Sequence, residues 1–199
     1  MRTIIFCFMM TAIFPAYSQD GTVSEFERTF LIDYLERTQS DMLELVTSLD
    51  EKTWSTKPSD GGWSVGEIVE HITSAENAVF GSIQEALAAP AQDMNLRKND
   101  AWLLSKVNDR GVKVSTPLPT QESNKSKEEV LKEYKNTRAE TLKFLSNDEL
   151  PLRNHFGKAL YGSADAYQLF LIIGGHNMRH TAQITETLDE FTNLQATQE

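Results

Sequence analysis

Apolar residues recur at helical spacing in several long segments of this chain. The first segment follows a capping box at residues 22–25 and carries apolar residues as far as Leu49. The second runs from Val65 to about Ala89 and stops at Pro90, because proline cannot continue a helix. Both patterns predict amphipathic helices with one buried face.

The second half of the chain repeats this organisation. Residues 126–129 form a further capping box, and the helix that follows them ends near Asn147. Ser163 is placed to cap a last helix that runs to about Glu190. With four long helices and no credible strand, the sequence predicts an all-α fold, a four-helix bundle.

Two connections are longer than a minimal bundle needs. Residues 90–125, between the second and third helices, contain one short helical pattern around Asp100–Asn108, and a connection of this length is usually functional or mobile. The segment 151–162 carries His155 just ahead of the last helix. Trp63 and Ile68 flank the start of the second helix as a hydrophobic staple, which is a structural role.

The N-terminus has the three parts of a secretory signal peptide. Arg2 supplies positive charge, residues 4–14 are apolar, and Ala16 and Ser18 form a small-residue cleavage site. The apolar part is well short of the roughly 20 residues that span a membrane. We therefore expect a signal peptide at residues 1–18 and one exported domain at 19–199, periplasmic or secreted, with no membrane association after cleavage.

Charge and cysteine content narrow the chemistry. The chain has 19 Lys and Arg against 29 Asp and Glu, a net charge of −10, and loss of Arg2 makes the domain one unit more acidic. Such a surface repels nucleic acid, so we expect a small-molecule partner. The single cysteine, Cys7, precedes the cleavage site, so we expect it to leave with the signal peptide, the alternative being a lipoprotein; this leaves histidine and carboxylate to build a site. Glycine-rich phosphate loops and the GxSxG motif are absent.

Histidine spacing gives the strongest chemical indication. His176 and His180 are four residues apart, so both project from one face of the last helix, within its apolar stripe. His71 lies at the edge of the apolar stripe of the second helix and can lean into the same groove. Three imidazoles of this kind can hold a metal ion, and the alternative is a set of buried histidines that bond to their neighbours.

Two stretches resemble the motifs of the DinB-like superfamily of metalloenzymes: residues 62–72, GWSVGEIVEHI, and residues 176–184, HNMRHTAQI. The resemblance implies a four-helix bundle with a three-histidine metal site on His71, His176 and His180. The identity of the ion stays open: zinc or nickel is the first expectation, and iron, copper or cobalt are the alternatives.

Three further residues are weaker candidates. Gln183 follows the histidine pair and is expected to orient a ligand or line a cavity, the alternative being a buried amide bonded to the backbone. Glu76 is a candidate catalytic base, and the alternative is that it is an ordinary carboxylate on the solvent-facing side of its helix. His155 is a candidate substrate contact, although most such residues are ordinary surface loop positions.

These patterns predict an exported, metal-dependent hydrolase or transferase that acts on a small molecule. The alternative is a non-catalytic bundle that binds a metal or ligand, or that forms a homodimer. A cavity that opens to solvent and reaches the histidines would favour the enzyme, and a closed one would favour the binding role.

Overall fold

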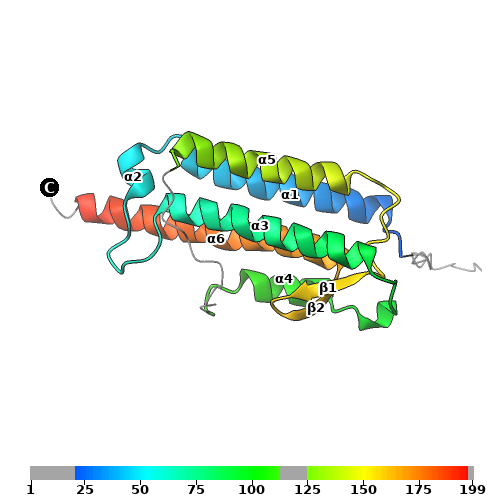
Figure 1. Cartoon of the computed structure of the whole chain (residues 1–199). Coiled ribbons are helices and arrows are strands. Elements are labelled where there is room, and N and C mark those ends of the chain that lie inside the picture. The colour runs from blue at the N-terminus through cyan, green and yellow to red at the C-terminus, as the bar shows by residue number, and fades with distance from the viewer. Residues whose placement is uncertain (1–20, 113–124, 197–199) are drawn as a thin grey trace, which may run out of the picture.

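The computed structural model describes residues 21–112 and 125–196, so the predicted signal peptide and part of the long connection lie outside the described residues. Figure 1 shows the predicted four-helix bundle, in which α1 runs beside α5 and α3 beside α6. The long helices are α1 (Glu25–Val46), α3 (Val65–Ala88), α5 (Lys127–Leu145) and α6 (Ala166–Ala196). The fold class predicted from the sequence is thus confirmed.

Shorter elements decorate the bundle. The helix predicted near residues 100–108 is present as α4 (Asp100–Asn108) and packs on α6. Four others were not predicted: α2 (Glu51–Ser55), the 3-10 helix η1 (Met94–Leu96), and the strands β1 (Phe156–Ala159) and β2 (Gly162–Asp165). No helix among the described residues is both long enough and apolar enough to cross a membrane.

Serine caps begin three of the long helices. Ser64 and Ser126 cap α3 and α5, each in a reciprocal bond with the glutamate three residues on, as the sequence indicates. The first box was misplaced by two residues, because Ser24 with Glu27 caps α1. The backbone before Ser24 is held outside the helix, where the Gly21 carbonyl accepts a bond from the Arg153 amide at 2.9 Å.

The expectation of no strand was wrong. Strands β1 and β2 form an antiparallel hairpin in which Phe156 faces Asp165, and Gly162 takes a φ of 92° at its turn. Ser163 lies inside β2, so it does not cap α6; Asp165 does, accepting a bond from the Gln168 amide at 2.7 Å. Strands of four residues are too short for a periodic pattern to reveal them.

A buried arginine anchors this hairpin to the bundle. The guanidinium of Arg153 lies 2.7 Å from Glu27 in α1, 3.0 Å from Asp100 in α4 and 3.3 Å from Asp165 in β2. It also stacks 3.6 Å from the centre of the Tyr167 ring. The hairpin is therefore held in a defined place beside α6 rather than hanging as a free loop.

A polar layer crosses the middle of the bundle. Each long helix contributes buried apolar residues to two clusters, one near each end, for example Leu31 and Met42 on α1. Between those clusters every helix places buried polar side chains: Thr38, His71, Thr73, Glu76, Thr137, Arg138, Thr141, Asn177 and His180. Buried polar groups need partners, so this layer is where chemistry is to be sought.

Candidate metal centre

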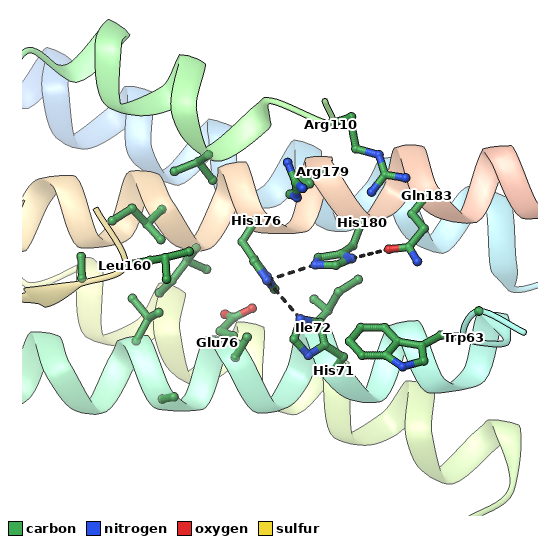
Figure 2. A pocket seen from close by; sticks show the side chains of 18 of the residues that line it. Trp63, His71, Ile72, Glu76, Arg110, Leu160, His176, Arg179, His180 and Gln183 are labelled. Atoms are coloured by element: carbon green, nitrogen blue, oxygen red, sulfur yellow. Dashed lines mark hydrogen bonds between the residues drawn. The ribbon is translucent and has the colours of Figure 1, made fainter. Parts of the chain in front are cut away.

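Three histidines in the polar layer converge on one point. The Nε2 atom of His176 lies 3.2 Å from Nε2 of His71 and 3.1 Å from Nε2 of His180. One ligand atom from each ring falls within 4.8 Å of the others. Figure 2 shows the three rings approaching from two helices, His71 from α3 and the other two from α6. The structure thus brings together the three residues that the resemblance indicates.

The spacing fits a metal ion. Two nitrogen ligands about 2.0–2.1 Å from a tetrahedral zinc ion are roughly 3.3 Å apart. The two Nε2 separations at His176, 3.2 and 3.1 Å, are close to that value. Because one imidazole proton cannot satisfy three converging nitrogens, a cation that accepts all three lone pairs is the fitting occupant.

Gln183 fixes the ring state of one ligand. The Nδ1–H of His180 donates to Oε1 of Gln183 at 2.8 Å. In a neutral imidazole this leaves Nε2 as a bare lone pair, directed at the shared point. The expected orienting role of Gln183 therefore has a geometric basis, whereas the Nδ1 atom of His71 is buried with no hydrogen-bond partner.

Burial keeps the cluster uncharged. Desolvation lowers the pKa of His71, and it lowers that of His176 well below 6.5, with repulsion from its histidine neighbours adding to the effect. Burial, together with His71, lowers the pKa of His180 to about 4. At neutral pH all three rings are therefore neutral imidazoles, each with one bare nitrogen, which is the form that binds metal ions.

A tryptophan forms the wall behind these rings. The Trp63 ring centre lies 4.7 Å from that of His71 and 6.3 Å from that of His180. Trp63 also lines the cavity described next, as Figure 2 shows. From its place before the second helix, Trp63 was expected to have a purely structural role. Its position just before α3, two turns ahead of His71, was the signal that could have placed it at the site.

The cluster lies in a cavity of about 650 Å³ between α3, α6, α4 and the hairpin. All three histidines line this cavity, as do side chains that are exposed on the surface, such as Leu160 and Asp60. The cavity therefore opens to solvent. By the criterion set from the sequence, this favours a site that admits a small molecule.

Glu76 lines the cavity but is not a free carboxylate. Its side chain is buried, contrary to the solvent-facing interpretation, and both oxygens accept bonds from the Arg138 guanidinium at 2.8 and 2.9 Å. Arg138 in turn donates to Thr38 and to the Leu35 carbonyl. With both of its oxygens engaged by the guanidinium, Glu76 is poorly suited to take a proton from a substrate.

Two arginines at the cavity were not expected from the sequence. Arg179 donates to the backbone carbonyls of Asp109 and Val112, and Arg110 pairs with Glu186 of α6. Both arginines line the cavity beside α6. Arg179 adjoins His180 in sequence, yet its contacts lie about 70 positions earlier in the chain, so spacing alone could not reveal them.

His155 lies apart from this group. Its Nδ1 atom is 3.1 Å from the carbonyl oxygen of Ala86, at the C-terminal end of α3. It is not among the residues that line the cavity. The structure therefore gives His155 a structural contact and does not bring it to the histidine cluster.

Comparisons with known proteins identify the family and the fold. The family model described as the DinB superfamily matches residues 34–184. Among solved structures, YfiT from Bacillus subtilis, described as a probable metal-dependent hydrolase with an unusual four-helix bundle topology, is similar with a TM-score of 0.61. The match has 15% sequence identity and covers 88% of this chain and 94% of that one, so it shows a shared fold. No curated protein matches the chain significantly.

Proposed function

This chain belongs to the DinB superfamily, and on that premise we propose that it is a metal-dependent hydrolase that acts on a small molecule. One observation carries the proposal: three uncharged histidines direct their Nε2 atoms to a single point on the wall of a solvent-accessible cavity. A closed structural site would have no such access. YfiT, which shares the fold, is described as a probable metal-dependent hydrolase, and this adds support.

His71, His176 and His180 would hold a divalent ion, with zinc or nickel the first expectation. When bound, the ion supplies Lewis-acid polarisation of a substrate oxygen. Residues of the chain would orient the ligands. Gln183 holds His180 in the tautomer with its proton on Nδ1, and Trp63 packs against the rings of His71 and His180 and limits their movement.

Metal analysis followed by a hydrolysis screen tests the proposal. The full chain, purified without a His-tag, should retain about one divalent ion per molecule after zinc or nickel loading and desalting. Ester and amide hydrolysis should disappear with a chelator and return on reloading. The His71→Ala variant, carried through the same steps, is the matched control and should show neither metal nor activity.

Three results would contradict this function. A chain that takes up no zinc or nickel would leave the site without its ion. A loaded chain that hydrolyses none of the substrates and instead transfers their acyl groups to an added thiol would be a transferase. A loaded chain with neither activity would be the non-catalytic binding bundle.

We also propose that the domain is exported, on the strength of the charged, apolar and small-residue pattern in residues 1–18. Protein recovered from its native host should begin at Gln19. N-terminal mass analysis measures this directly, and cytoplasmic protein that retains Met1 would refute it.

A further inference from the structure

The cavity wall changes character along α6 at the histidines. The residues of α6 that line the cavity before His176 are all apolar, and those that line it after His180 are all polar. The apolar set is Leu169, Ile172 and Ile173; the polar set is Gln183, Glu186, Thr187 and Glu190. At about 1.5 Å per residue, the apolar set extends roughly 6 Å along the helix and the polar set roughly 10 Å. The histidine cluster thus marks a border between two halves of one cavity.

Helix α3 repeats this division because it runs antiparallel to α6. Trp63, just before α3, stacks on His180, and His71 meets His176, so the later part of α3 faces the earlier part of α6. That later part contributes Ile72, Ala75, Ala78 and Val79 to the cavity wall. The apolar stretches of the two helices therefore lie at the same end.

The hairpin and α4 close the apolar end. Leu160, at the hairpin turn, lines the cavity while its side chain remains 65% exposed, and Val107 of α4 lines it from another side. Figure 2 shows Leu160 on the side of His176 that faces away from Gln183. We call the space bounded by Ile72, Val79, Val107, Leu160, Leu169 and Ile173 the apolar half.

Charged groups do not alter the character of the apolar half. Glu76 lies at its border, but its charge is matched by the bidentate Arg138. Lys158 of β1 also lines the cavity, and its side chain is exposed at the surface, where an ammonium group stays hydrated. What remains for an occupant next to the histidines is an apolar surface.

Open apolar volume of this kind is unlike an ordinary core. Protein cores are packed to crystal-like density and leave few voids larger than a water molecule. A cavity of about 650 Å³ is instead within the size range of small-molecule sites, which are mostly apolar with a few placed polar groups. Apolar side chains kept apart around such a space are stabilised when an apolar group fills it.

We infer that the substrate carries an apolar arm, an alkyl or aryl group, joined directly to the polar group that faces the histidines, and that this arm occupies the apolar half. The inference rests on the proposed function only for the group that faces the metal. The polar half, with Gln183 and Arg110, would receive the remainder of the molecule.

Binding of straight-chain alkyl hydroxamates tests the inference, because their head group chelates metal ions and their tail length can be varied alone. Titration calorimetry of the zinc-loaded full chain should give an affinity that rises about fourfold for each added methylene, until the apolar half is filled. The same dependence on chain length should persist, at lower affinity, in metal-free protein. An affinity independent of tail length would overturn the inference.

A pair of matched variants locates the tail. Ala78 is an exposed position of α3 that lines the cavity, and Ser74 is an exposed position of the same helix that does not. Ala78→Asp should weaken the octyl compound at least about tenfold and leave the two-carbon compound unchanged, since only the tail meets the new charge. Ser74→Asp should change neither. Equal weakening by both variants would mean that charge on α3 acts at a distance, which would refute the assignment.

A second variant and the metal-free arm separate this inference from the proposed function. Leu160→Ser on the hairpin should also reduce the chain-length dependence, whereas Leu96→Ser, at another exposed leucine outside the cavity, should not. If metal and hydrolysis are absent but chain-length dependence remains, the function fails and the apolar half stands. If metal and hydrolysis are present but the affinity ignores tail length, the reverse holds.

Discussion

The polar layer of the bundle contains two clusters that differ in how their members are satisfied. In the first, Glu76 is 2% exposed and Arg138 is fully buried, and the two form a bidentate ion pair. In the second, three buried or half-buried histidines point uncharged nitrogens at one another. Both clusters use α3, where His71 and Glu76 are five positions apart.

The difference separates a structural polar cluster from a binding one. In the Arg138–Glu76 pair each charge is neutralised by its partner, and Arg138 also donates hydrogen bonds to Thr38 and to the Leu35 carbonyl. The histidine cluster brings three ring nitrogens together with no opposite charge among them, and the buried Nδ1 of His71 lacks a hydrogen-bond partner. A buried cluster that is incomplete within its own chain indicates an occupant from outside.

The largest expected effect comes from breaking the complete cluster. Arg138→Met should lower the free energy of unfolding by about 3–5 kcal/mol, because it leaves the Glu76 charge buried and unpaired. Chemical denaturation of metal-free protein measures this. The double variant Arg138→Met with Glu76→Leu should cost less than the single change, since no charge is stranded. A stable Arg138→Met protein that has lost its metal would instead assign Arg138 to the metal centre.

Removing a histidine should lower metal affinity and leave the fold intact, the opposite of what is expected for Arg138→Met. His71→Ala, His176→Ala or His180→Ala should each lower metal affinity by more than about a hundredfold, while the helical circular dichroism spectrum persists. His155→Ala should keep the metal and lose about 1 kcal/mol of stability with its bond to the Ala86 carbonyl. Loss of metal from His155→Ala with retention in His71→Ala would show that the centre is built elsewhere.

The smallest expected loss of metal affinity concerns the contact that orients His180. Gln183→Leu should weaken metal binding about 10- to 100-fold, because the His180 ring loses the acceptor that fixes its proton on Nδ1. Competition with a chromophoric chelator gives the affinity. Gln183→Glu, which keeps an oxygen acceptor, should restore most of it. Equal losses in the two variants, or a matching loss of stability in metal-free protein, would reduce Gln183 to a packing role.

Local patterns in the sequence determined the four long helices, because hydrophobic periodicity and serine caps act over a few residues. The i, i+4 spacing of His176 and His180 likewise placed two rings on one helix face. The same local patterns predicted Ser163 as the cap of α6 and missed the β1–β2 hairpin. Asp165 is the cap instead, because the pairing of that hairpin places it at the start of the helix.

Only the tertiary structure decided which polar residues meet. The pairing of His71 with His176 joins positions 105 apart, and that of Glu76 with Arg138 joins positions 62 apart. A helix pattern fixes the direction of a side chain, but its partner depends on how far neighbouring helices slide and turn against one another. For that reason Glu76 could be taken from the sequence for a solvent-facing carboxylate and Trp63 for a simple staple. The packing of α3 against α5 pairs Glu76 with Arg138, and its packing against α6 places Trp63 against His71 and His180.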